Sequence, residues 1–134
     1  MSLIKSLDHL NMTVKNLNAT IEWYSRVLGF VVVEKGVQDG LPWAILRAGE
    51  ALLCFYERID LVFMDNAERS TFGLNHMCFR VTDRTKWEAI IQREPLEMLY
   101  NGPVVWPHST AWYIADPTGH EIEITLWNDD HIAF

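Results

Sequence analysis

The segment Leu7–Val14, which reads LDHLNMTV, returns 67 residues later as the segment Leu74–Val81, which reads LNHMCFRV. In both copies apolar residues alternate with the others, which is the period-two pattern of a strand with one buried face. The histidine of each copy, His9 or His76, falls on the face opposite the apolar triplet. A pattern that recurs at half the chain length predicts two modules of one architecture.

Each copy is followed by one helix and then by three strands. The helices are expected over 16–28, stopped by Gly29, and over 85–93, before Pro95. The strands are expected over 30–34, 43–48 and 51–57 in the first half and over 97–100, 110–115 and 121–127 in the second. The sequence therefore predicts an α+β protein whose single domain, 1–134, consists of two βαβββ modules, about 5–58 and 73–128, joined by a connector over 59–72.

One helix covers only one face of a four-stranded sheet, so each module leaves its other face open. We expect the two sheets to combine, within one chain or across a dimer, into a curved mixed sheet whose concave side forms a cup. By strand parity the residues that point into it are His9, Asn11, Cys54, Tyr56, His76, Cys78, Glu121, Glu123 and Thr125. The candidates for contact with a substrate are Asn11, Cys54, Tyr56, Cys78 and Trp112.

A metal site is expected in this cup. Two histidines at matched positions of a repeat, His9 and His76, and the carboxylate of Glu123 form a set of two imidazoles and one carboxylate that leaves open positions on a divalent ion. The alternative is that each histidine is a structural strand residue and that Glu121 and Glu123 lie on a solvated face. The matched parity of the two histidines favours the metal.

The amino-acid composition of the chain limits the classes of partner that it is expected to bind. The chain has 134 residues, 49% of them hydrophobic, and a formal net charge of −7, which disfavours a nucleic-acid surface. It has no apolar run of the roughly 18 to 20 residues that a membrane helix needs and no signal-peptide pattern, so a cytoplasmic protein without a membrane partner is expected. Two cysteines are too few for a disulfide scaffold, which leaves metal binding to histidines and carboxylates.

Four pieces of the chain resemble the vicinal oxygen chelate superfamily, which includes glyoxalase I, fosfomycin-modifying thiol transferases, methylmalonyl-CoA epimerases and extradiol dioxygenases. They are Leu7–His9, the segment WYSRVLGF over 23–30, Asn75-His76 and the segment DPTGHEIE over 116–123. The resemblance extends from Leu7 to Trp127. It implies two βαβββ modules, a divalent metal ion in the cup (Fe²⁺, or Zn²⁺, Ni²⁺ or Mn²⁺), a small-molecule substrate and commonly a homodimer.

The enzyme classes in this superfamily carry different residues at several site positions, and this chain can be compared with each class at those positions. Glyoxalase I has a second glutamate where this chain has Cys54, and the fosfomycin-modifying enzymes have a threonine where it has Asn11. Extradiol dioxygenases have a tyrosine ten residues before the ligand glutamate, as Tyr113 stands before Glu123, and a Gly-Pro loop followed by a histidine, to which His108 is similar. Tyr113 and His108 are thus the catalytic candidates, with a core aromatic and a surface histidine as the alternatives.

These observations favour a metal-dependent enzyme that acts on a small substrate with two adjacent oxygens. Extradiol-dioxygenase-like chemistry is preferred. A glyoxalase I-type lyase or isomerase, or a glutathione transferase-like enzyme, is the alternative. A metal-free drug-binding protein of the bleomycin-resistance type is the alternative from another class, although a binder has no need of the metal triad.

Overall fold

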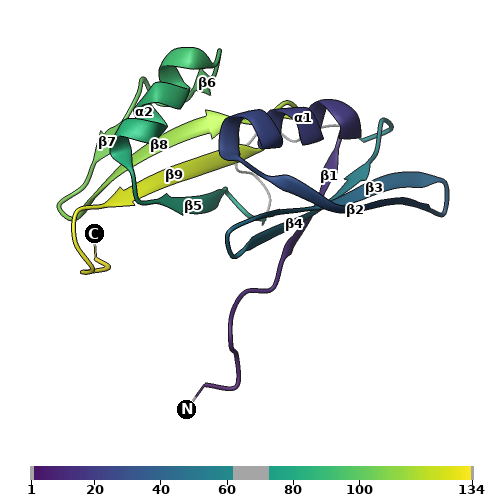
Figure 1. Ribbon diagram of the computed structural model, residues 1–134, viewed down its shortest axis with the longest axis horizontal. Helices are drawn as coiled ribbons and strands as arrows, with labels where there is room; N and C mark the ends of the chain where they lie inside the picture. Colours follow the sequence, from purple (N-terminus) through teal and green to yellow (C-terminus); the bar gives the residue numbers. More distant parts are fainter. Residues whose placement is uncertain (1, 62–72, 134) are drawn as a thin grey trace. The chain divides into compact units, whose positions relative to one another are not determined.

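The computed structural model describes residues 2–61 and 73–133, and the chain divides into two compact units, Met1–Val62 and Phe63–Phe134. The first unit contains β1 (Leu10–Val14), α1 (Leu17–Leu28), β2 (Val31–Gln38), β3 (Leu41–Ala48) and β4 (Ala51–Glu57) (Figure 1). The second contains β5 (Met77–Val81), α2 (Arg84–Arg93), β6 (Glu97–Met98), β7 (Val104–Val105), β8 (Ser109–Ala115) and β9 (Glu121–Trp127). The predicted α+β class and the order of elements in each half are confirmed, with β7 as an additional short strand.

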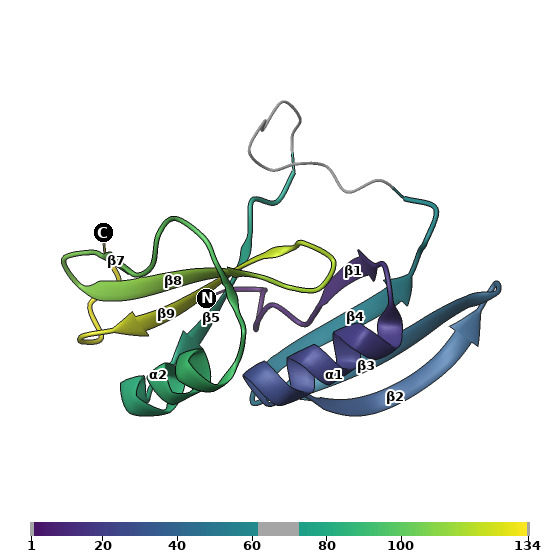
Figure 2. The ribbon, with the colours of Figure 1, turned by 90° about the horizontal axis from the view of Figure 1, so that it is seen from above.

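The first sheet has the strand order β1-β4-β3-β2, in which β1 runs parallel to β4 and the other pairs are antiparallel. Helix α1 lies across one face of this sheet (Figure 2). Tyr24 of the helix is fully buried there, with its ring 5.6 Å from that of Phe30 and 5.0 Å from that of Phe55. These contacts remove large apolar surfaces from water and account for much of the stability of this unit.

Helix α1 begins and ends where its sequence provides caps. The side chain of Asn16 accepts a hydrogen bond from the backbone N–H of Ala19 at 2.8 Å, which satisfies one of the unpaired donors of the first turn. At the other end Gly29 adopts the left-handed conformation with φ 72°, and its N–H bonds to the carbonyl of Ser25. The helix predicted over 16–28 is therefore confirmed, with Asn16 as its cap.

The second sheet has the order β5-β9-β8-β6, with β7 also pairing with β8, and β5 runs parallel to β9. Helix α2 begins after Asp83, whose carboxylate accepts from the N–H of Lys86 at 3.0 Å. Its one buried residue, Trp87, packs edge-to-face against Trp112 of β8 at 6.3 Å between ring centroids. One face of the second sheet is thus covered by α2, as the sequence predicts.

Several boundaries differ from the expectation, including β6, which ends at Met98 instead of residue 100. Strands β1 and β5 begin at Leu10 and Met77, so His9 and His76 each stand immediately before a strand instead of within it. Strand β2 continues to Gln38, and the segment over 103–108, expected to be a loop, contains β7. Of the expected connector, residues 62–72 lie outside the described residues. Within the described ranges, no helix has the length and apolar character needed to span a bilayer.

The joining of the two sheets into one cup, the single domain and the dimer stay predictions. Each unit does leave one sheet face without a helix of its own. On that face of the first sheet Trp43 packs over Gly36, where an added Cβ would come within 2.6 Å of the indole ring. A glycine in the middle of β2 is thereby explained, because only a residue without a side chain admits Trp43.

Candidate functional site

The motif Asp116–His120 builds the turn that places the glutamates of β9. The carboxylate of Asp116 is buried, and its Oδ1 accepts backbone hydrogen bonds from Thr118, Gly119 and His120, each at 2.9 Å. Gly119 has a φ of 109°, which side-chain-bearing residues rarely adopt. Three backbone donors on one carboxylate hold the turn in a single shape and so fix the register between β8 and β9.

This register puts the functional candidates of the second unit on one face. In β9, Ile122 and Ile124 are completely buried, whereas Glu121 and Glu123 alternate with them and lie on the face opposite α2. Glu123 is the register partner of Cys78 on β5 and of Tyr113 on β8. The strand parity expected for Glu123 and Cys78, and the neighbouring-strand position of Tyr113, are thus observed within this unit.

His76 lies between the two glutamates. Its Nε2 is 2.9 Å from Oε2 of Glu123, and its Nδ1 is 3.2 Å from Oε2 of Glu121. The second oxygen of Glu121, Oε1, accepts a hydrogen bond from the hydroxyl of Tyr100. Glu121 and Glu123 retain 6% and 15% of their side-chain exposure, so these carboxylates are enclosed and have partners, as buried charge requires.

Tyr113 borders this group of charges. Its ring meets the imidazole of His76 edge-on at 5.6 Å and the ring of Tyr100 at 5.2 Å. Burial, followed by the charge of Glu123, raises the pKa of the Tyr113 phenol, while a hydrogen bond from Trp106 lowers it. The hydroxyl is therefore protonated at neutral pH and is able to donate a hydrogen bond.

The two thiols are poor nucleophiles. Burial, and then the charge of Glu123, raises the pKa of Cys78 to about 12. Burial raises the pKa of Cys54 as well, with a smaller contribution from Asp8. Because the thiolate is the reactive species, neither cysteine is suited to nucleophilic catalysis near neutral pH.

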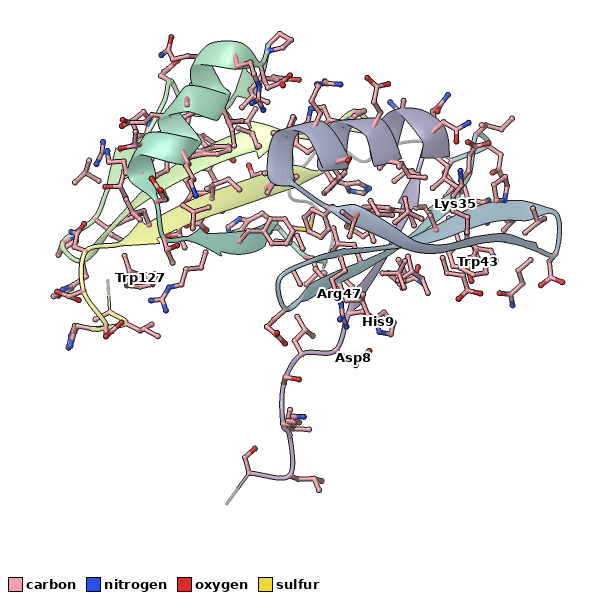
Figure 3. The ribbon with its side chains drawn as sticks, in the orientation of Figure 1. Asp8, His9, Lys35, Trp43, Arg47 and Trp127 are labelled. Atoms are coloured by element: carbon pink, nitrogen blue, oxygen red, sulfur yellow. The ribbon has the colours of Figure 1, made fainter. Side chains whose placement is uncertain are left out.

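The first unit presents its own histidine in a more open setting. Nδ1 of His9 is 2.7 Å from the carboxylate of Asp8, and both residues lie with Arg47 on the side of the sheet away from α1 (Figure 3). In the register of β1 with β4, Asn11 pairs with Cys54. Cys78 pairs with Glu123 in the second unit, so Cys54 occupies the position that corresponds to Glu123.

The donor set suits a divalent metal ion. Each imidazole has a carboxylate at Nδ1, which leaves Nε2 as the atom able to bind a metal, the pattern usual for metal-ligating histidines. Nε2 of His76 and one oxygen of Glu123 converge, so that a cation can replace the proton they share. Among the residues that the structure describes, no group of three histidine, cysteine or acidic side chains is placed so as to hold a metal ion.

Of the other candidates for contact with a substrate, Tyr56 lies on the face that parity predicted, and Trp112 lies on the helix-covered face. Tyr56, whose hydroxyl donates to Gln38 at 3.0 Å, shares its face of the first sheet with Asn11 and Cys54. Trp112 is 3% exposed and packs on Trp87, so the expectation that it contacts a substrate is wrong. Its register partner Ile124 belongs to the helix-covered face, and strand parity assigns Trp112 to the same face.

His108 lies apart from the other catalytic candidate. It precedes β8, five residues from Tyr113, which corresponds to about 16 Å along an extended strand. Its ring lies tilted at 47° against that of His131, with 4.5 Å between the ring centroids, and its Nδ1 is 3.4 Å from Asp129. The structure therefore brings Tyr113, and not His108, to His76 and Glu123.

Sequence reasoning assigned no role to Asp8, Glu121 or Tyr100. Asp8 is adjacent to His9, and Glu121 shares the parity of Glu123, so a search for carboxylates next to the expected ligands would have found both. Tyr100 lies 21 residues from Glu121 in the chain, in a turn where it has a φ of 55°. No spacing rule connects these two residues, and only the fold brings them together.

Comparison with known proteins agrees with this geometry. Residues 6–124 match the model of the glyoxalase/bleomycin resistance protein/dioxygenase superfamily, so the chain belongs to this superfamily. It is 28% identical over 135 residues to the virulence protein STM3117 of Salmonella typhimurium (strain LT2), with 93% of this chain and 86% of that protein covered.

Two solved structures show the same fold. A glyoxylase/bleomycin resistance protein/dioxygenase domain from Frankia sp. EAN1pec has a TM-score of 0.80 at 19% identity, with 96% of each chain covered. The fosfomycin resistance protein FosX from Listeria monocytogenes, solved with Mn(II) and sulfate, has a TM-score of 0.68 at 17% identity, with 92% of this chain and 93% of that chain covered. The superfamily contains enzymes and also non-enzymes.

Proposed function

We propose that this protein is a metal-dependent enzyme that binds a divalent ion through His9, His76 and Glu123 and acts on a small substrate with two adjacent oxygens. One observation carries the proposal: in the second unit Nε2 of His76 and Oε2 of Glu123 converge at 2.9 Å, with Tyr113 beside them. The proposal requires that His9 of the same chain, or of a second copy in a homodimer, completes the set.

Each residue has a separate task in this proposal. A divalent ion held by His9, His76 and Glu123 would stabilise the negative charge that develops on neighbouring substrate oxygens. Tyr113, whose phenol is protonated at neutral pH, donates a hydrogen bond or a proton to a substrate oxygen. Trp106, through its hydrogen bond to the phenol, orients that hydroxyl.

Within this class we propose ring-opening of a catechol-like substrate, as in extradiol dioxygenases. The supporting observation is that Tyr113 and Glu123 are register partners on adjacent strands, next to His76. A glyoxalase I-type reaction is the second candidate. Cys54, with its raised pKa, stands where that reaction would use a glutamate, and a protonated thiol is a poor substitute for a carboxylate.

The metal set is tested by elemental analysis of protein purified without chelators. We expect about one divalent ion per chain in the wild type and in His131→Ala, a control histidine outside the set. We expect its loss in His9→Ala, His76→Ala and Glu123→Ala. Full metal content in any of these three variants contradicts the assigned ligand. A folded wild type that binds no added divalent ion contradicts the enzyme and favours a drug-binding protein.

The reaction is tested by loading the metal-free protein with Fe(II), Mn(II), Ni(II) or Zn(II). Catechols with oxygen are assayed against glutathione adducts of α-ketoaldehydes. We expect catechol cleavage with Fe(II), and a loss of about 10²-fold in kcat for Tyr113→Phe at unchanged metal content. Activity confined to the glutathione adduct with Ni(II) or Zn(II) refutes the dioxygenase and supports the lyase or isomerase. Undiminished kcat in Tyr113→Phe means that Tyr113 only packs.

A further inference from the structure

The buried carboxylate of Glu121 has no task in the proposed reaction, yet both of its oxygens have partners. Oε2 is 3.2 Å from Nδ1 of His76, and Oε1 accepts from the hydroxyl of Tyr100. Glu121 is 7% exposed, and it alternates in β9 with residues that are completely buried. Burying a carboxylate is energetically costly, so the position of Glu121 between these two donors indicates a specific role.

We propose that Glu121 is a positioning residue for His76, and that Tyr100 in turn holds Glu121. The inference rests on the proposed metal site, because His76 is one of its three ligands. Glu121 accepts the proton on Nδ1 of His76, so that Nε2 is the nitrogen that faces Glu123 and is the one able to exchange its shared proton for a metal ion. Tyr100 donates to the other oxygen, so the carboxylate keeps one orientation.

The physical basis is the choice between the two neutral forms of imidazole. A ring that carries its proton on Nε2 cannot bind a metal there, and an acceptor at Nδ1 favours the form that can. The acceptor also limits rotation of the ring. The edge-on contact of Tyr113 with His76 restrains the imidazole further. The ring of Tyr113 is itself met edge-on by Tyr100 at 88°, so Tyr100 supports His76 through both Glu121 and Tyr113.

The two halves are unequal in this respect, which argues for a specific role of Glu121. The partner of His9 is Asp8, an adjacent and exposed residue on a segment before β1. The partner of His76 comes from 45 residues further along the chain, on a central strand of the sheet, and is enclosed. The backbone position of Glu121 is therefore set by the β8–β9 turn, whereas that of Asp8 is set by an exposed segment before β1.

The test compares Glu121→Gln with a matched control, Glu88→Gln, which changes an exposed carboxylate paired with Arg84 on α2. The affinity for Zn²⁺ is measured by competition with a chromophoric chelator. We expect Glu121→Gln to bind Zn²⁺ about 10- to 100-fold more weakly with unchanged stoichiometry, and Glu88→Gln to bind like the wild type. Tyr100→Phe removes only a hydroxyl, and we expect a smaller loss in the same direction.

A second readout does not depend on a metal. Nitrogen-15 NMR of metal-free protein reports which nitrogens of His76 carry a proton. We expect a proton on Nδ1 in the wild type and in Glu88→Gln, and its loss from Nδ1 in Glu121→Gln, where Glu123 remains as the acceptor at Nε2. If the wild type binds no metal, the proposed function fails and this measurement alone decides the role of Glu121.

The inference is overturned by equal Zn²⁺ affinities of Glu121→Gln and Glu88→Gln, or by the absence of a proton on Nδ1 of His76 in the wild type. If Glu121→Gln does not fold, Tyr100→Phe provides the same comparison. The inference would then be overturned if Tyr100→Phe binds Zn²⁺ as tightly as the wild type and leaves the proton on His76 in the same place. A purely structural Glu121 would lower the melting temperature and leave both readouts unchanged.

Discussion

His9 and His76 occupy the same place in their modules, directly before a strand that pairs in parallel with the last strand of its sheet. Their surroundings nevertheless differ. The side chains of His9 and its partner Asp8 are 44% and 86% exposed, whereas those of His76, Glu121 and Glu123 are 31%, 6% and 15% exposed. The second unit thus holds an enclosed polar network, and the first unit holds an open pair beside the neutral Cys54.

The difference shows that the same βαβββ module can surround its histidine with buried charged groups in one half of the chain and with exposed ones in the other. A buried carboxylate needs donors around it, and the second unit supplies His76 and Tyr100 for Glu121. In the first unit the position that corresponds to Glu123 is a thiol, which needs no such partners. Three predictions sharpen this comparison, in order of decreasing size of the expected effect.

The thiols provide the largest contrast. In chelator-treated protein near pH 8, we expect Cys78, with its pKa raised to about 12, to present about 10³-fold less thiolate than an unperturbed cysteine. Its rate of alkylation should fall in proportion and increase steadily with pH toward 12. Cys54, whose pKa is also raised, should react more slowly than a free thiol but faster than Cys78. Mass spectrometry of the separated peptides measures both rates.

Glu123→Gln is the control for this prediction. It removes the neighbouring charge, so alkylation of Cys78 should become faster while that of Cys54 stays the same. Equal rates for the two cysteines in the wild type would contradict the strongly raised pKa of Cys78.

The cores provide the second contrast. Tyr24→Ala should lower the free energy of unfolding by about 3 to 5 kcal/mol, because it leaves a cavity between Phe30 and Phe55. Trp87→Phe should cost less than about 1.5 kcal/mol. The indole N–H of Trp87 is buried without a hydrogen-bond partner among the described residues, and its removal offsets part of the lost packing. Urea unfolding measures both values, and a cost for Trp87→Phe as large as that of Tyr24→Ala would be inconsistent with this account.

The helix caps provide the smallest effect and a test of equivalence. Asn16→Ala and Asp83→Ala should each cost about 1 kcal/mol, because each removes a side-chain acceptor for a backbone N–H of the first turn. This corresponds to a fall of roughly 4 °C in melting temperature, measured by calorimetry. Asn16→Ser and Asp83→Ser keep an acceptor and should retain most of the stability. A serine variant as unstable as the alanine variant would show that the side-chain acceptor is not the cause.

Much of the fold was readable from local patterns. The helix over 17–28 follows from its apolar spacing, the cap at Asn16 and the stop at Gly29, all of which are short-range features. The alternation in β9 assigned Glu123 and Ile124 to opposite faces, as observed. Trp112 was expected to contact a substrate, but its register partner is the buried Ile124 and its ring packs on Trp87 of α2.

The sequence by itself determined the repeat, the α+β class, and the positions of His9, His76 and Glu123 in that repeat, because periodicity and turn chemistry act over a few residues. Only the tertiary structure decided that Glu121 and Tyr100 surround His76 and that His108 lies elsewhere. These relations join residues 21 and 45 positions apart in the chain. They depend on strand register, which the three hydrogen bonds to the carboxylate of Asp116 and the packing of α2 set together.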